Sequence, residues 1–353
     1  MFSLESPLQT DAWAKVQRKL GKPTSTLQGD GWSALCVEEK RAVGSYLYVP
    51  YGPICRDAGA LDDALRAIHA HARRRRAWWV RVEPRSSERE ALWSDLPLWR
   101  DVLEADRFHP ALHDHQPKHT RLIDLTAGPD AILAAATGSI RTIHRNHAKK
   151  GLEVRTSRNP DDVTILAAFL SQAAGHKHIV ARSASYLHAV ASAMMPVDAA
   201  TLYSTWKDGA PLCATLVYDS PTQRLFAHAA MPVEHRKLRP NQPLITRALL
   251  DAHDAGIRTA DLFGLAPPDE PNHPWAGFSA FKRSFGGEDV THLGTWERDI
   301  VPGARRALEA REHLAERRQT QRARGPEATA DSSAPVASTV ATTASAENSS
   351  VPH

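Results

Sequence analysis

Residues 273–296 read HPWAGFSAFKRSFGGEDVTHLGTW, and this stretch says most about the fold. Phe278, Phe281 and Phe285 recur at helical spacing, which predicts one apolar face on a helix over residues 276–285. Gly286–Gly287 follow directly, and glycines in this place end a helix because they accept the left-handed backbone of a C-cap. The stretch therefore predicts a short amphipathic helix with a defined stop.

Lys282 and Arg283 follow Phe281 and are expected to project away from the apolar face of this helix. Two interpretations of these basic residues are open. Phe281 and Lys282, as a cation–aromatic pair near a helix start, suit a polyanion such as an RNA end or a phosphorylated substrate. An ordinary amphipathic helix with solvated basic residues has the same spacing.

Composition narrows the class of protein. The 353 residues are enough for two domains, and a hydrophobic content of 42% supports real cores. No apolar run reaches the roughly 18 residues of a membrane span. The N-terminus lacks the basic and apolar regions of a signal peptide, and three scattered cysteines fit reduced thiols, so we expect a cytoplasmic protein.

Charge is distributed unevenly although the net charge is only +4. Residues 304–324 carry seven Arg and three Glu. Residues 302–324 are expected to form one lightly packed helix with Pro302 in its first turn. Residues 325–353 are rich in Ala, Ser, Thr and Pro without aromatics, which predicts a disordered tail. Residues 1–303 are too weakly basic for a general nucleic-acid binder, although a local basic groove is compatible with their charge.

The remaining chain alternates strands and helices, which favours mixed sheets over a parallel one. The expected strands are 32–38, 42–49, 78–83, 121–124, 152–156, 199–206, 211–218, 224–230 and 259–262. The expected helices are 10–20, 60–74, 129–134, 139–149, 160–173, 183–194, 242–255 and 276–285.

Five motifs in order resemble the FemX/FemAB family, the peptidyltransferases that use aminoacyl-tRNA to build the peptidoglycan cross-bridge. They are Tyr48-Val-Pro-Tyr-Gly-Pro53, Arg81-Val-Glu-Pro84, the run from Gln116 through Thr120 to Leu125, the basic segment 141–151, and the H-x-W-A-G-x-x-x-F-K-x-x-F-G-G signature quoted above. The resemblance spans about residues 5–315. His144 departs from it, since the family usually has Arg there, and the tail has no counterpart.

The resemblance implies an α/β (α+β) fold of two GNAT-like domains with mixed sheets. Residues 1–126 would form the first domain, 127–291 the second, and 292–324 would return as a helical segment to complete the first. No long heptad run is present, so the chain is more similar to FemX-type members than to those with a coiled-coil arm.

Two candidate residues suit the diphosphate of a nucleotide-linked acceptor. Lys15 follows Trp13, whose side chain is expected to anchor the helix, and the family has a phosphate-binding Lys in a similar W-x-K context. Arg182 precedes a helix N-terminus, an arrangement that binds anions, and Tyr186 follows at the family's spacing of four. The alternative for Lys15 and Arg182 is a solvated helix cation.

Further candidates concern the reaction itself. Glu83 ends a strand, where a carboxylate could take a proton from the attacking amine; the alternative is a structural carboxylate paired with Arg81 or Arg85. Tyr51, inside the first motif, is assigned to substrate binding by the resemblance. The resemblance also implies that Lys282 acts at the tRNA 3′ end, stabilising the oxyanion, with Phe281 stacking nearby.

Two basic or histidine-rich stretches have plainer interpretations. His109, His113, His115 and His119 do not have a standard metal-ligand spacing and are expected to form a polar loop before a strand. Arg73–Arg76 end a helix, where cations complement the dipole, although contact with tRNA or a lipid headgroup is an alternative.

The expected function is transfer of an amino acid from aminoacyl-tRNA to the stem-peptide amine of lipid II or UDP-MurNAc-pentapeptide. We expect no metal or bound cofactor, a monomer, and at most peripheral contact with the inner membrane face. One alternative is a GNAT-type N-acyltransferase that uses acyl-CoA, which is disfavoured because residues 235–243 lack the glycines of a pyrophosphate loop. The other is a GNAT-like binding protein without turnover.

Overall fold

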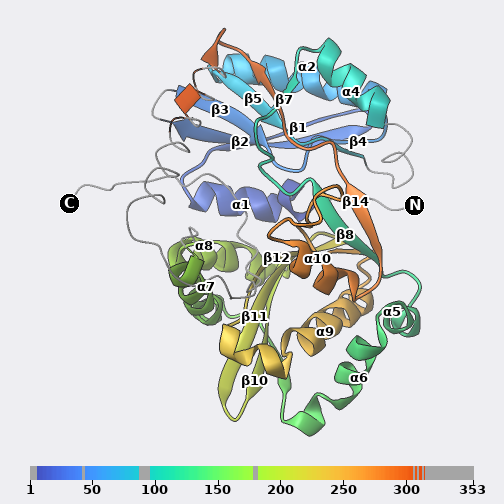
Figure 1. The fold of residues 1–353 in the computed structure, drawn as a ribbon. Coiled ribbons are helices and arrows are strands. Elements are labelled where there is room, and N and C mark those ends of the chain that lie inside the picture. The colour runs from blue at the N-terminus through green and yellow to red at the C-terminus, as the bar shows by residue number, and fades with distance from the viewer. Residues whose placement is uncertain are drawn as a thin grey trace, which may run out of the picture.

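The computed structural model describes residues 6–41, 44–86, 96–177 and 182–304, together with residues 307, 310, 311 and 314. The expected tail, 325–353, and most of the expected helix 302–324 lie outside the described residues. Two mixed sheets are stacked along the molecule, with the N-terminal helix α1 between them (Figure 1). The expected fold class, two GNAT-like α/β units, is confirmed.

The first sheet has the strand order β6-β4-β2-β3-β5-β15-β7, and β1 pairs with β2 outside this path. Its strands are β1 Thr24–Gly29, β2 Trp32–Arg41, β3 Gly44–Val49, β4 Ile54–Cys55, β5 Trp79–Val82, β6 Arg85–Ser86, β7 His109–Pro110 and β15 Trp296–Asp299. Helices α2 (Ala58–Arg74) and α4 (Leu96–Ala105) cover one face, with a core that includes Leu61, Ile68 and Phe108. The helical spacing of apolar residues in α2 buries its core side.

The second sheet has the order β14-β8-β13-β12-β11-β10-β9. Its strands are β8 His119–Asp124, β9 Glu153–Ser157, β10 Ala200–Lys207, β11 Ala210–Asp219, β12 Gln223–Ala230, β13 Thr259–Asp261 and β14 Glu288–Thr291. β12 and β13 pair in parallel, whereas the other pairings are antiparallel, so the sheet is mixed as expected.

Helices cover both faces of the second sheet. One core joins η1 (Pro7–Gln9) and α1 (Asp11–Lys19) to α7 (Val163–Lys177) and α8 (Ala184–Met194). The other joins α5 (Pro129–Ala135), α6 (Gly138–Asn146) and α9 (Asn241–Asp254) to the opposite face. Short 3-10 turns complete the chain: η2 Ala148–Lys150, η3 Pro160–Asp162, η4 Met195–Val197 and η5 Val233–Leu238.

Helix α10 (Ala276–Arg283) forms where the phenylalanine spacing predicted it. Gly286 and Gly287 follow with φ of +85° and +83°, the left-handed conformation expected of the stop. A Cβ at Gly287 would lie 2.2 Å from the Leu122 carbonyl oxygen, so no larger residue fits there. The chain can then enter β14 beside β8.

The C-terminal strands show how the two sheets exchange chain segments. β15 pairs with β5 and β7 of the first sheet, whereas β14, just before it, pairs with β8 of the second. β8 lies within the range expected for the first domain, yet it belongs to the second sheet because its partners β13 and β14 do. The domain limits themselves stay a prediction. Strands β1, β14 and β15, the two-residue strands β4, β6 and β7, and helix α4 were not predicted.

Candidate functional site

Lys282, on the last turn of α10, is enclosed between the two halves of the molecule. Its side chain is 4% exposed, and its Nζ donates hydrogen bonds to the carbonyl oxygens of Phe263 and, at 2.7 Å, Gly264. The ring of Phe278, one turn earlier, has its centroid 3.9 Å from Nζ. Burial lowers the Lys282 pKa well below its usual range, and the charge of Asp261 opposes this. When Lys282 is protonated its ammonium has three donors, so one remains beyond the two carbonyl contacts.

Asp261, the last residue of β13, fixes the turn that holds Lys282. It is fully buried, and its Oδ1 accepts hydrogen bonds from Thr120 Oγ1 and from the Phe263 backbone N–H, at 2.8 Å in the second case. Phe263 has a φ of +62°, so the turn is left-handed and directs both carbonyls at Lys282. Sequence reasoning included Asp261 in a strand but missed this role, although a carboxylate at a strand end was an available signal.

Arg85 of the first sheet meets Asp261 of the second. The two side chains are fully buried, with Arg85 Nη2 3.8 Å from Asp261 Oδ2. Arg85 Nη2 also lies 3.0 Å from Nε2 of His292, and its guanidinium stacks 4.5 Å from the Tyr51 ring centroid. Burial, as the larger cause, and the charge of Arg85 lower the His292 pKa well below its usual range. His292 is therefore neutral and accepts the hydrogen bond from Arg85.

Glu83 is held by four donors. Its Oε2 accepts from the Tyr48 hydroxyl at 2.8 Å and the Tyr51 N–H at 3.0 Å, and its Oε1 from the Gln116 N–H at 2.8 Å and the Thr295 hydroxyl at 2.9 Å. Desolvation raises the Glu83 pKa, and these hydrogen bonds oppose the rise. The carboxylate has about four acceptor positions, and all are occupied.

This geometry bears on both interpretations of Glu83. It contacts neither basic neighbour suggested by the sequence, because Arg81 pairs with Glu297 at 2.6 Å and Arg85 faces Asp261. Its donors come from three separate segments, so Glu83 joins β3, the loop before β8 and the link to β15. The role of Glu83 as a base stays a prediction.

A small pocket, open to solvent, lies over this cluster. Its lining includes Tyr51, Glu83, Arg85, Gln116 and His292. Tyr51 therefore reaches the pocket, but its hydroxyl donates to the Pro117 carbonyl at 3.0 Å. Its ring packs edge-on against Phe263, with a centroid distance of 6.1 Å. Tyr51 thus connects Glu83 to the turn that holds Lys282.

Phe281 faces a different part of the molecule. Its ring packs against the core beneath α9 and meets Phe285 edge-on at 5.2 Å. The aromatic partner of the Lys282 ammonium is therefore Phe278, and the expected pairing with Phe281 is wrong. Residues i and i+4 share a helix face, whereas i and i+1 diverge.

Lys15, Arg182 and Tyr186 lie at a second place, where α1 packs along α8. Lys19, one turn after Lys15, donates from Nζ to Ser192 Oγ at 2.6 Å, so this side of α1 faces α8. Lys15 itself is exposed. Arg182 is half-buried and stacks on Tyr186, with 4.7 Å from guanidinium carbon to ring centroid. Residues 178–181, before Arg182, lie outside the described residues.

A buried histidine, His228 of β12, lies under these aromatic residues. Its ring meets Tyr186 at 6.1 Å and Tyr218 at 5.8 Å, both edge-on. Burial, followed by the charge of Arg182, lowers its pKa to about 3. The Arg182 Nε is enclosed and has no hydrogen-bond partner among the described residues. This end of the site thus carries an incompletely paired cation.

His115, in the histidine-rich stretch before β8, has a structural role. His115 accepts a hydrogen bond from Arg81 Nη1 at 2.9 Å and meets Tyr48 edge-on at 4.7 Å. Burial, and then the charges of Arg81, Arg41, Arg182 and Lys22, lowers the His115 pKa well below its usual range. Within the described ranges, no group of three or more His, Cys, Asp or Glu residues is arranged to hold a metal ion. No helix among the described residues is long and apolar enough to cross a membrane.

Comparisons with known proteins agree on the fold. Residues 134–283 match the family model described as an acetyltransferase (GNAT) domain. The chain is similar to a crystal structure of FemX, with 16% identity and a TM-score of 0.73 over 86% of this chain and 94% of that one. It is also similar to the C-terminal domain (DUF2156) of a putative lysylphosphatidylglycerol synthetase from Agrobacterium fabrum, with 16% identity and a TM-score of 0.53 over 87% and 92% of the two chains.

No curated protein matches the sequence. The expected FemX-like fold is thus confirmed, and the family match supports an acyltransferase type of domain over residues 134–283.

Proposed function

We propose that the protein transfers an aminoacyl group from aminoacyl-tRNA to an amine of a peptidoglycan precursor, either lipid II or UDP-MurNAc-pentapeptide. The observation that carries the proposal is the enclosed Lys282 ammonium, held at the junction of the two sheets in a FemX-like fold. The second similar structure, whose name refers to a lysylated lipid, fits an aminoacyl donor as well.

The reaction exchanges an ester for an amide. The acceptor amine attacks the ester carbonyl carbon, the C–N bond forms, the bond from carbon to the ribose oxygen breaks, and the amine proton ends on that oxygen. Negative charge develops on the carbonyl oxygen in between. The free N–H of Lys282 is the donor we assign to that oxyanion, because a fixed cation in a water-poor site acts most strongly on charge that develops in the transition state.

The acceptor is assigned to the two separate places of the site. Its amine would enter the pocket over Glu83, which holds the wall in shape through Tyr51 and Gln116. Its diphosphate would bind Lys15 and Arg182 between α1 and α8, with Tyr186 supporting the guanidinium. Phe281 would then act by packing α10 in place.

The N-terminus of α9 argues against acyl-CoA as the donor. A pyrophosphate site there needs free backbone N–H groups. Pro240 and Pro243 have none, and the Gln242 N–H already donates to the Arg239 carbonyl at 3.3 Å. No glycine lies between His235 and Pro243 to let a phosphate approach the backbone.

The test is a transfer assay with purified protein, charged tRNA pools and either acceptor, read by product mass. We expect an acceptor enlarged by the mass of one or more amino-acid residues, and no product after RNase treatment. Acyl-CoA without tRNA is the parallel arm. Full activity in that arm would overturn the proposal in favour of an N-acyltransferase, and stoichiometric binding without product would favour a binding protein.

A further inference from the structure

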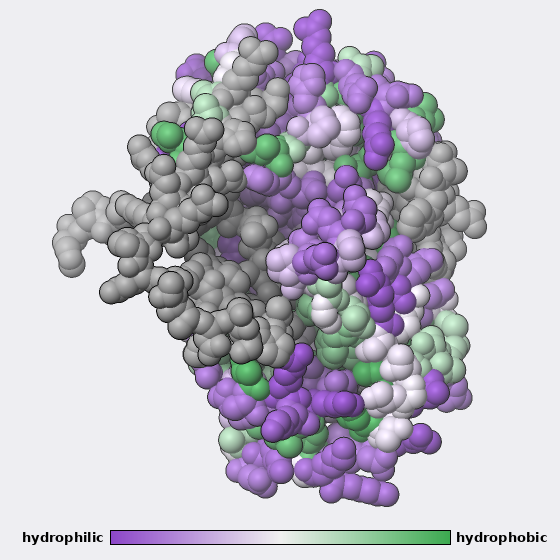
Figure 2. Space-filling model, viewed as in Figure 1, coloured by the Kyte–Doolittle hydropathy of each residue, from purple (hydrophilic) through white to green (hydrophobic). Residues whose placement is uncertain are grey.

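A group of exposed cations lies on α6, η2 and η5 and has no part in the site described so far. We call it the α6–η5 face, and it consists of Arg145, Lys149, Lys150, Arg236, Lys237 and Arg239. Hydrophilic side chains dominate the lower rim of the molecule in Figure 2, the end at which Figure 1 places α6 and the β10–β11 hairpin.

The α6 and η2 part of the face is basic because its sequence contains no acidic residue. Residues 131–152 contain four Arg or Lys residues and no Asp or Glu. Arg141 is used internally, since its guanidinium donates to the carbonyls of Ala134 and Ala136. Arg145, Lys149 and Lys150 form no ion pair with any described residue. Arg155, one strand further on, is by contrast neutralised by Glu153 at 2.7 Å.

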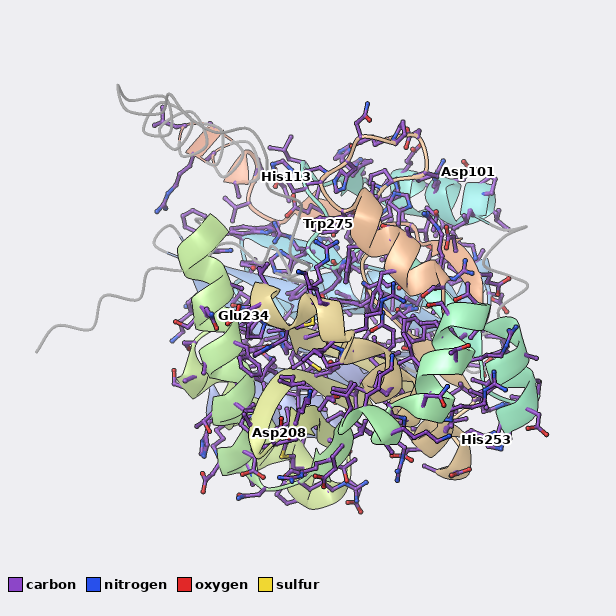
Figure 3. The ribbon with its side chains drawn as sticks, turned by 60° about the horizontal axis from the view of Figure 1, so that its bottom comes forward. Asp101, His113, Asp208, Glu234, His253 and Trp275 are labelled. Carbon is purple, nitrogen blue, oxygen red and sulfur yellow. The ribbon has the colours of Figure 1, made fainter. Side chains whose placement is uncertain are left out.

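The acid on η5 points away from the face. Glu234 accepts a hydrogen bond from Gln172 of α7 at 3.3 Å, and Figure 3 shows it on the side of η5 toward α7. On the other side, Arg239 Nη1 donates to Ser139 Oγ at 3.0 Å, which ties the end of η5 to the first turn of α6. The buried Ile140 and Ile143 fix α6 on the core. The cations are therefore carried by anchored elements.

The face begins where the helix of Lys282 ends. The Thr137 N–H, just before α6, donates to the Ser284 carbonyl, two residues after Lys282, at 2.9 Å. From that point α6 runs on for nine residues, or about 13 Å at 1.5 Å per residue. The cations Arg145, Lys149 and Lys150 lie in its last turn and beyond, so the first of them is about 12 Å along the helix from the Ser284 contact and the others extend away from it.

We propose that the α6–η5 face holds the duplex acceptor stem of the RNA donor, through its phosphates, while the aminoacylated 3′ end reaches Lys282. The inference rests on the proposed function and adds a place for the part of the donor that does not react. Duplex RNA is bound mainly through its backbone and shape, which requires spaced cations on a rigid surface and no base-reading pocket. Continuity with α10 favours RNA over an anionic membrane as the occupant.

The test compares two donors that carry the same amino acid, a full aminoacyl-tRNA and an aminoacylated CCA trinucleotide without a stem. The variant is Lys149→Ala/Lys150→Ala. Its matched control is Arg100→Ala/Arg107→Ala, which removes the same charge from exposed residues on and just after α4 in the other half of the molecule.

We expect the KM for aminoacyl-tRNA to rise about tenfold in the variant, with kcat within twofold, and the KM for the trinucleotide to stay unchanged. The slope of log K against log salt for uncharged tRNA should fall by about 2, one for each phosphate that the removed lysines neutralise in the wild-type complex. The control double variant should change none of these values.

An unchanged KM for aminoacyl-tRNA, an equal effect of the control, or an equal loss with the trinucleotide would each overturn the proposal. So would a variant that loses binding to phosphatidylglycerol vesicles but keeps its affinity for tRNA, since the face would then serve a membrane. If the wild-type protein transfers from neither donor, the proposed function fails, and uncharged tRNA alone decides: weaker binding by the variant than by the control supports the face, and equal binding rejects it.

Discussion

The two ends of the candidate site differ in how their polar groups are satisfied. Lys282 and Glu83 are themselves enclosed, and their hydrogen-bond partners are fixed atoms of the protein. Between α1 and α8, Lys15 is exposed, and Arg182 leaves its Nε without a partner among the described residues. An enclosed group with fixed partners acts through geometry and charge at the reacting atoms, whereas an open cation acts by binding. The difference predicts different kinetic and stability signatures for substitutions at the two ends.

The largest effect is expected from pH, at the histidine beneath the open end. His228 has a folded pKa of about 3 against 6.5 for a free histidine. Below pH 6.5 the unfolded chain binds a proton that the folded chain does not, so stability falls with pH until the folded pKa is reached. The difference between the two pKa values of His228 corresponds to about 4–5 kcal/mol of folding stability, at 1.36 kcal/mol per pKa unit.

Urea unfolding between pH 7 and pH 4 measures this, with His228→Gln as the variant and the exposed His109→Gln as the control. The His228 variant should have a flatter profile than wild type. The buried His115 and His292 titrate in the same direction, so some slope remains. Equal slopes in all three proteins would show that His228 is not the group responsible.

Lys282→Met sharpens the comparison from the enclosed end. It keeps the volume of the side chain and removes the charge, so turnover should fall by roughly a hundredfold or more, equivalent to about 2–4 kcal/mol, with little change in the KM for the acceptor. Lys282→Arg should restore little, because a planar fork does not replace a compact ammonium between two carbonyls. The neighbouring exposed Arg283→Ala is the control. A turnover within a few-fold of wild type would place Lys282 in a structural role.

Glu83→Gln separates a base from a structural group. The amide nitrogen would face two of the four donors, so the free energy of unfolding should fall by about 2 kcal/mol. Residual turnover in the folded fraction should keep its dependence on pH. Glu270→Gln, at an exposed acid, is the control. Loss of one limb of the pH–rate profile in a fully folded variant would instead identify Glu83 as the base.

Arg182→Ala and Lys15→Ala test the open end and should have the smallest effects. We expect the acceptor KM to rise about tenfold, the value of one charge-assisted hydrogen bond, and stability to change by only about 0.5 kcal/mol. The rise should be largest for acceptors that retain the diphosphate. Arg18→Ala, on the exposed side of α1, is the matched control. If neither KM changes, the diphosphate binds elsewhere.

Local spacing in the sequence was sufficient for much of this molecule. The three phenylalanines and two glycines predicted α10 and its stop, and apolar periodicity predicted the other helices on the two sheets except α4. The prolines and the missing glycines before α9 are visible without any structure. These features depend on residues a few positions apart, where backbone geometry alone decides the outcome.

The chemistry of the site depended on partners that no local pattern reveals. Glu83 is 33 residues from Gln116 and 212 from Thr295, and Arg85 meets His292 across 207 residues. The fold decides which distant donors reach a carboxylate, and so whether it is a free base or has all its acceptor positions occupied. This cannot be read locally, since hydrogen bonding and desolvation act over a few ångströms in space. The pairing of Lys282 with Phe278, and the burial that lowers its pKa, were likewise decided by how α10 packs between the two sheets.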